Sequence, residues 1–406
     1  MPHSWRHGLT KFCTATTRSV SHPSDTAADV PWYVLPALVV AQFAGTSLWF
    51  AINAIVPDLQ VSLQWPATAV GTLTAALQFG FIVGTLLFAL AMIADRFDPR
   101  WVFFLSSLGG AALTIVAWLR IDHYVVLLMC RFLTGLCLAG IYPVGMKIAA
   151  QWFPKGLGHA LGWLVGALVL GSASAHGLRA VTASLPWETL MVAVAVLAVA
   201  GGLLVLSLRQ RVPAQHRPVA LTWSAFGVMW TNRLVRRPVL GYFGHMWELY
   251  TVWVLLPFIL GTRLAGEPVL WWSFAIMGSG ALGCVIGGHL VAKVGGVRVA
   301  TTQLGISGLC CLLAPLMLQA PDALFYAWLL VWGITVAGDS PQFSALTASR
   351  APSHLVGSIL TMTNSIGFAI SIVSILLSTQ LAQHWPLEVV LPLLAVGPAL
   401  GVWAMR

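Results

Sequence analysis

Charged side chains are scarce in this chain of 406 residues, where Asp, Glu, Lys and Arg make up only 8%, against about a quarter in soluble domains. With 58% hydrophobic residues and a mean hydropathy of +0.86, too few polar side chains remain to cover a water-soluble globule. Apolar side chains in such excess must face lipid, so the composition predicts a polytopic membrane protein and excludes a soluble domain.

Other common signatures are also missing. The six cysteines show no metal-ligand spacing and no disulfide framework, and five of them lie inside apolar runs, where small core side chains are expected. No GxxxxGK[ST] loop, which would cradle nucleotide phosphates, is present, so direct use of ATP and any cofactor are not expected. The net charge of +9 is spread over short loops, which argues against nucleic-acid binding.

The apolar residues fall into twelve runs, each long enough to cross a hydrocarbon core, which takes about 20 helical residues. The expected spans are 32–56, 68–93, 101–119, 124–150, 157–181, 187–208, 239–261, 269–292, 299–319, 323–348, 355–379 and 387–404. We therefore predict an all-α membrane protein with two six-helix bundles, 32–208 and 239–404, joined by a cytosolic linker over 209–238. Residues 1–31 have no apolar core, so a disordered cytosolic tail is expected there instead of a signal peptide.

The basic residues indicate the orientation. An even number of spans puts both termini on one side of the membrane. Of the 21 Lys and Arg residues, 17 lie on that side, one (Arg131) lies within a span, and three lie on the opposite side, namely Arg120, Arg179 and Arg263. Short cytoplasmic loops hold the excess of positive charge, so both termini and the linker are expected in the cytosol, beneath a bacterial inner membrane.

The two halves resemble each other at an offset of 198 residues. This offset aligns 139–143 with 337–341, and Trp49 with Trp247. Because these matches fall at equivalent places in the two halves, they favour an internal duplication, which is common in transporters.

Three charged residues lie deep within predicted spans, where a charge costs about 2.5–3.5 kcal/mol and usually serves a function. They are Arg131, Glu248 and Asp339, in the fourth, seventh and tenth spans. The first span adds polar and aromatic groups, namely Gln42, Thr46, Ser47, Trp49 and Asn53. These four spans are expected to face one aqueous cavity.

Arg131 is the candidate for anion binding, because a guanidinium can grip a carboxylate or oxyanion with two parallel hydrogen bonds. Tyr142, eleven residues further on, is expected on the same helix face. The other candidate substrate-binding residues are Trp49, Trp247, Asn53 and Asn364, of which Asn364 has an interhelical hydrogen bond as its equal alternative.

Glu248 is the first candidate proton carrier, assisted by His245, which lies three residues earlier on the same helix and within hydrogen-bonding reach. Asp339 is the second candidate. Either acid could instead pair permanently with Arg131, and the substrate would then be neutral or cationic.

Ordinary structural roles, without a part in transport, are expected for several other residues. Lys147 is expected to snorkel to the cytosolic surface. His159, His176 and His289 lie near span ends and are expected at the interface. Gly158, Gly162 and Gly166 recur every fourth residue, which predicts close packing of the fifth span against another helix.

The loop Ala94-Asp95-Arg96-Phe97-Asp98-Pro99-Arg100 resembles the signature loop of the major facilitator superfamily, and the fourth span with Arg131 and Gly135 resembles its second motif. The resemblance covers all twelve spans. It implies two pseudo-symmetric six-helix bundles, alternating access, and a central cavity lined by helices 1, 4, 7 and 10. It also implies a cytosolic latch that comprises Asp95, Arg96 and Arg100.

The sequence departs from the family pattern in places that bear on transport. Gly166-Ala167 stands where the antiporter motif has Gly-Pro, which favours symport or uniport. Residues 42–59 and 244–258 are similar to bacterial permeases loosely grouped with nitrate/nitrite and cyanate carriers. The glycine-rich nitrate signature is missing, so the substrate of that group is not carried over.

We therefore predict a secondary active transporter, not an enzyme, that works as a monomer in the lipid bilayer and moves a small solute, expected to be an anion, with protons. The alternatives are a uniporter or an exchanger of a neutral or cationic solute, such as a drug or metabolite exporter, and a sensor that does not transport. A membrane enzyme is the remaining alternative. It rests on 305–308, Gly-Ile-Ser-Gly, which resembles a rhomboid protease motif but has no histidine deep in a later helix to act as base.

Overall fold

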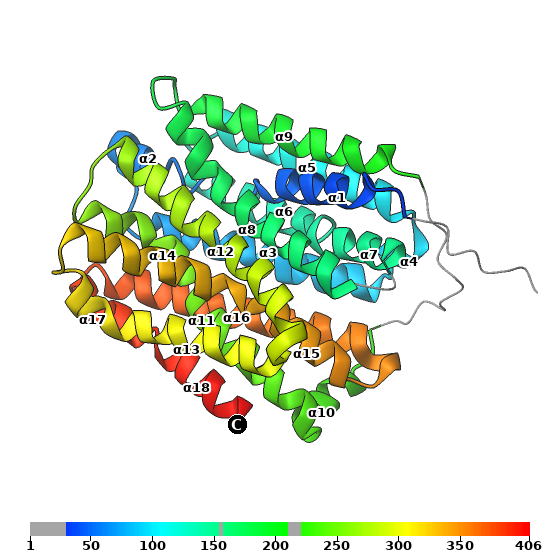
Figure 1. Ribbon diagram of the computed structural model, residues 1–406. Coiled ribbons are helices and arrows are strands. Elements are labelled where there is room, and N and C mark those ends of the chain that lie inside the picture. Colours follow the sequence, from blue (N-terminus) through cyan, green and yellow to red (C-terminus); the bar gives the residue numbers. More distant parts are fainter. Residues whose placement is uncertain (1–29, 154–156, 210–220) are drawn as a thin grey trace, which may run out of the picture. The chain divides into compact units, whose positions relative to one another are not determined.

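The computed structural model describes residues 30–153, 157–209 and 221–406 (Figure 1). Most of the predicted tail and 210–220 of the predicted linker lie outside the described residues. Contacts between the two predicted bundles unite Trp32–Arg406 into one compact unit, which holds every described helix. No strand occurs in these described ranges, as the prediction of an all-α protein requires.

Eighteen α-helices and one short 3-10 helix make up the described chain (Figure 1). The first half contains α1 (Val34–Thr46), α2 (Val56–Leu63), α3 (Ala69–Leu90), α4 (Ile93–Arg96), α5 (Pro99–Leu119), α6 (Tyr124–Leu138), α7 (Tyr142–Trp152), α8 (Leu157–Val181) and α9 (Glu188–Ser207). The second half contains α10 (Ser224–Thr231), α11 (Arg233–Gly261), α12 (Glu267–Val294), α13 (Gly296–Met317), α14 (Asp322–Gly338), α15 (Ser340–Arg350), η1 (Ser353–Leu355), α16 (Val356–Leu381), α17 (Leu387–Leu393) and α18 (Val396–Met405).

Eleven helical segments of the described chain are long and apolar enough to cross a membrane, and each coincides with a predicted span. The predicted span 32–56 differs, because α1 ends at Thr46 and 47–55 form successive turns before α2. Near this break the hydroxyls of Thr46 and Ser47 each donate to a backbone carbonyl earlier in α1, at 2.7 Å. Such bonds compete with the regular helical pattern, so the first membrane segment is interrupted near its middle.

Two other membrane segments are interrupted at equivalent positions. The helix pair α6 and α7 is broken before Pro143, and the pair α14 and α15 is broken before Pro341. Proline lacks the N–H that would bond four residues back, and its ring clashes with that carbonyl, so each helix breaks just upstream. The two prolines are separated by the 198-residue offset found in the sequence.

The helix packing repeats between the halves. Helix α3 packs on α6 as α12 packs on α14, and α1 packs on α8 and α9 as α11 packs on α16 and α18. Gly135 and Gly333, again 198 residues apart, sit at the first two of these crossings. An added Cβ would lie 1.9 Å from the Leu77 carbonyl oxygen at Gly135 and 2.2 Å from that of Ile276 at Gly333. Both crossings therefore require glycine.

The halves meet where α8 packs on α12 and where α3 packs on α16 (Figure 1). The predicted glycine stripe on α8 contributes less to this contact than expected. A Cβ at Gly158 would meet no atom within 4 Å, and one at Gly166 would come no closer than 3.5 Å to α12. The predicted packing of this span against another helix is confirmed by the contact of α8 with α12, although added Cβ atoms at these glycines would make ordinary contact at most.

Candidate substrate and proton site

Arg131 lies in α6 with 3% of its surface exposed. Its Nη1 donates to the Leu48 carbonyl at 3.1 Å and its Nη2 to the Trp49 carbonyl at 2.5 Å. Both carbonyls lie in the turns that interrupt the first membrane segment, so the guanidinium caps the broken end of α1. Neither Glu248 nor Asp339 forms an ion pair with Arg131, and the permanent pairing considered from the sequence is therefore wrong.

Next to this cap lies a group of six rings from both halves, which we call the aromatic cluster: Trp49, Phe50, Phe81, Tyr250, Trp253 and Phe368. Trp49 stacks on Tyr250 with ring centroids 5.7 Å apart and planes at 15°. Phe81 of α3 and Phe368 of α16 are 4.7 Å apart. Trp49, a predicted substrate-binding residue, thus belongs to a contact between the halves.

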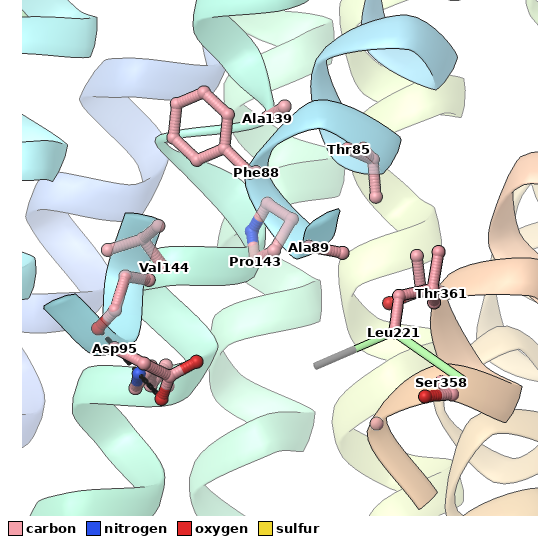
Figure 2. Close-up of a pocket in the computed structure, with 13 residues that line it drawn as sticks. Thr85, Phe88, Ala89, Asp95, Ala139, Pro143, Val144, Leu221, Ser358 and Thr361 are labelled. Atoms are coloured by element: carbon pink, nitrogen blue, oxygen red, sulfur yellow. Dashed lines mark hydrogen bonds and ion pairs between the residues drawn. The ribbon is translucent and has the colours of Figure 1, made fainter. Parts of the chain in front are cut away.

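A cavity lies on either side of the aromatic cluster. The far-side cavity, of about 860 Å³, is lined by Asn53 and Trp253 and by the connections around Asp58 and Leu264. The linker-side cavity, of about 290 Å³, has Thr85 and Ala89 of α3 on one side, and Leu221, Ser358 and Thr361 on the other (Figure 2). Residues of both halves line each cavity, so relative movement of the halves would change both.

The remaining predicted substrate-binding residues are dispersed. Asn53 donates from Nδ2 to Thr74 Oγ1 at 2.8 Å and lines the far-side cavity. Trp247 packs against Gly397 of α18 and lines neither cavity. Tyr142 begins α7, and the break that precedes it removes the continuous helix on which its alignment with Arg131 was predicted. Asn364 is half-buried in α16.

His245 pairs with Asp339, whereas its position on the helix predicts a contact with Glu248. Its Nδ1 lies 2.7 Å from Asp339 Oδ1, and both side chains are almost wholly buried. Asp339 is the residue that joins α14 to α15, at the break described above. The structure therefore brings two of the three proton candidates together, one on α11 and one at the junction of α14 and α15.

Glu248 has a separate set of partners inside the second half. Its Oε1 accepts hydrogen bonds from Ser307 Oγ at 2.5 Å, Trp332 Nε1 at 2.6 Å and Cys311 Sγ at 3.2 Å. Its Oε2 has no partner among the described residues. Glu248 lines neither cavity. Sequence reasoning missed these three donors, and Ser307 was noticed only within the protease-like motif.

The predicted latch residues bond within the first half. Asp95 forms an ion pair with Lys147, whose Nζ also donates to the Ala94 carbonyl at 2.5 Å, so Lys147 does not simply snorkel. Arg100 forms an ion pair with Asp98 at 2.6 Å, and its hydrogen bond holds the pKa of that carboxyl below the usual value. Arg96 is exposed. A latch between the halves stays a prediction.

His176 was expected at the membrane interface, and this expectation is wrong. Its side chain lies in α8 with 1% exposed and lines the far-side cavity. Loops and helices of both halves surround this cavity and bury His176. A count of residues from the end of the span does not reveal that burial.

Two similar helical halves, with a cavity on either side of their buried contact, define a multi-pass membrane transporter. A family model described as "Major Facilitator Superfamily" matches residues 38–375. The chain belongs to the major facilitator superfamily, and the resemblance of its loop and fourth span is thereby confirmed. The further likeness to nitrate/nitrite and cyanate carriers stays a prediction.

Two curated relatives are similar to part of the chain. The chloramphenicol resistance protein of Streptomyces lividans is 30% identical over 275 residues, which cover 64% of this chain and 66% of that protein. An uncharacterized transporter of Buchnera aphidicola subsp. Schizaphis graminum is 24% identical over 151 residues, or 37% of this chain and 36% of that protein. The chain thus spans less than two thirds of the length of either relative.

Two solved structures have the same fold. A mutant of the nucleoside transporter NupG has a TM-score of 0.72 at 13% identity, with 91% of this chain and 98% of that chain covered. The human organic anion transporter MFSD10 (TETRAN) has a TM-score of 0.70 at 16% identity, with 92% and 100% covered. At these identities the likeness supports the fold alone.

Proposed function

We propose that this transporter is a secondary active carrier that moves a small solute by alternating access and couples the movement to protons. The observation that carries the proposal is the pair of cavities on opposite sides of the aromatic cluster, each lined by both halves. Separating Trp49 from Tyr250 and Phe81 from Phe368 would connect the two cavities. Rocking of one half against the other would expose the solute first to one side of the membrane and then to the other.

The proton site is the pair formed by Asp339 and His245, with Glu248 as the second candidate. A charged group costs free energy in the membrane interior, which favours uptake of a proton when its pairing is lost. Asp339 has the ionisable side chain of His245 as its partner and joins two helices at a break. A change of charge there can alter the angle between α14 and α15. Glu248 is instead held by three donors inside the second half and lines neither cavity.

Two solute classes remain candidates. The structure gives less support to the anion predicted from Arg131, because each amino group of the guanidinium already donates one N–H to a carbonyl and so does not point freely to a solute. Nε has no partner among the described residues. A neutral amphipathic solute is favoured by the largely apolar lining of the far-side cavity. The similarity to a chloramphenicol resistance protein makes chloramphenicol a suitable neutral probe.

Transport by purified protein in liposomes tests the proposal. Chloramphenicol serves as the neutral probe and benzenesulfonate as the anionic probe, each with a pH gradient imposed in either direction. A gradient of one pH unit is worth about 1.4 kcal/mol per proton, enough for about tenfold accumulation. We expect one probe to accumulate by about this factor and a protonophore to abolish the accumulation. Accumulation that survives the protonophore would contradict proton coupling.

We further propose that the linker and both termini are cytosolic, in a bacterial inner membrane. The distribution of basic residues supports this orientation, with 17 of 21 on that side. Alkaline phosphatase fused after residue 225 is expected to be inactive in bacterial cells, whereas a fusion after Arg120 is expected to be active. The opposite pattern would reverse the orientation.

A further inference from the structure

The far-side cavity is large and mostly apolar. Helices α2, α3 and α8 of the first half and α11 and α12 of the second half contribute to its walls. Its apolar lining includes Trp253, Val254, Pro257, Phe258, Leu264 and Leu270. A volume of about 860 Å³ lies within the usual size of small-molecule sites, which are mainly apolar with a few placed polar groups.

His176 supplies such a polar group. It is 1% exposed, it lines the cavity, and neither ring nitrogen makes a well-aligned hydrogen bond with the described residues, where its one backbone contact is a weak one with Ala173 in the preceding turn. A buried polar group without a partner costs about 1–3 kcal/mol. A leucine at this position in α8 would avoid that cost, so stability of the fold alone does not account for the histidine.

Asn53 presents a second unsatisfied group to the same cavity. Its Nδ2 is used by Thr74, but its Oδ1 has no partner in the described part of the chain, although the residue is only 5% exposed. His176 offers one donor and one acceptor when neutral, and Asn53 adds an acceptor. Three hydrogen-bonding atoms from two elements therefore border one apolar cavity.

The charged side chains at this cavity already have partners. Arg179, three residues beyond His176, pairs with Asp58 at 3.2 Å and donates to the Thr182 carbonyl at 3.0 Å. Glu267 accepts from Trp271 at 2.9 Å. Glu267 is exposed at the edge of the cavity, and the buried polar groups left for a solute, on His176 and Asn53, carry no fixed charge. This pattern suits a solute without net charge better than an anion or a cation.

We propose that the far-side cavity binds a neutral amphipathic solute, with an aromatic ring against Trp253 and Phe258 and hydroxyl or amide groups on His176 and Asn53. This inference rests on the proposed transport function and names the solute class and the residues that select it. His176 is a residue that contacts the solute. Its imidazole selects solutes that can both donate and accept a hydrogen bond.

Equilibrium binding of tritiated chloramphenicol to the purified full-length protein tests the inference. The probe is neutral and aromatic and carries hydroxyl and amide groups. We expect His176→Leu to weaken binding about tenfold, the usual effect of one lost hydrogen bond. His176→Gln retains a donor and an acceptor and is expected to restore most of the affinity. The matched control is His159→Leu, in the same helix but exposed and remote from the cavity, with affinity unchanged.

Thermal unfolding of the same variants separates solute contact from structural support. Because His176 makes no well-aligned hydrogen bond in the described protein, His176→Leu is expected to keep the Tm or raise it while affinity falls. A lowered Tm, an unchanged affinity, or no binding of the probe by the wild-type protein would each overturn the inference. The assay uses no proton gradient, so its failure leaves proton coupling standing. Failure of coupled transport, with binding still dependent on His176, would contradict only the coupling.

Discussion

Replacing Arg131 with methionine is expected to lower the free energy of unfolding by about 2–6 kcal/mol. The guanidinium is the donor for the carbonyls of Leu48 and Trp49, which lie where the first membrane segment is interrupted. Methionine has a similar length but no donor, so both carbonyls would lose their partner. An unsatisfied buried carbonyl costs about 1–3 kcal/mol, and water is not available to replace the donor within the membrane.

Thermal or denaturant unfolding of the purified variants in detergent measures this loss. The free energy of unfolding of Arg131→Lys is expected to lie between those of the wild type and the methionine variant. An ammonium retains the charge but not the planar fork that reaches two carbonyls. Arg120→Met, at an exposed helix end, is the control and is expected to change stability by no more than about 0.5 kcal/mol.

These variants also separate the two roles considered for Arg131. If the guanidinium mainly caps the broken helix, Arg131→Lys loses stability, and any loss of benzenesulfonate binding accompanies that destabilisation. If it mainly binds an anion, Arg131→Lys loses about tenfold in benzenesulfonate affinity while its unfolding curve stays that of the wild type. The second result would contradict the capping role and restore the anion predicted from the sequence.

The sequence was sufficient for the fold because membrane segments depend mainly on composition and length. The breaks before Pro143 and Pro341 follow from a local property of proline, and the equivalent glycines Gly135 and Gly333 occur at the same offset. The interruption of the first segment was not predictable in this way. Besides the local hydroxyl bonds of Thr46 and Ser47, it depends on Arg131, which satisfies the freed carbonyls from more than 80 residues away in the chain.

The candidate site was less predictable for a related reason. Spacing along one helix placed His245 beside Glu248, but the partner that it contacts, Asp339, comes from a different helix. Nothing in the spacing of Ser307, Cys311 and Trp332 indicates that the fold brings them to one carboxylate oxygen. Hydropathy identifies which residues are buried, whereas the partner of a buried polar group is decided by tertiary packing.

Replacing Asp339 with asparagine is expected to abolish accumulation driven by a pH gradient while sparing solute binding. Asparagine has nearly the same shape and keeps an acceptor for His245 Nδ1, but it cannot gain or lose a proton. The carrier would then equilibrate its solute without coupling. Accumulation of about tenfold across one pH unit would fall to the passive ratio of about one. Exchange of labelled for unlabelled solute, which needs no net proton movement, is expected to continue.

Glu248→Gln is the matched comparison, because it makes the same change of charge at the other buried carboxyl of the second half. Its side chain lies away from both cavities and is held by three donors, so we expect reduced stability with accumulation retained. His245→Gln retains a donor to Asp339 but cannot carry a charge, and it is expected to weaken coupling as Asp339→Asn does. If instead Glu248→Gln loses accumulation and Asp339→Asn retains it, the proton is carried inside the second half by Glu248, and the pair of His245 and Asp339 serves only to join two broken helices.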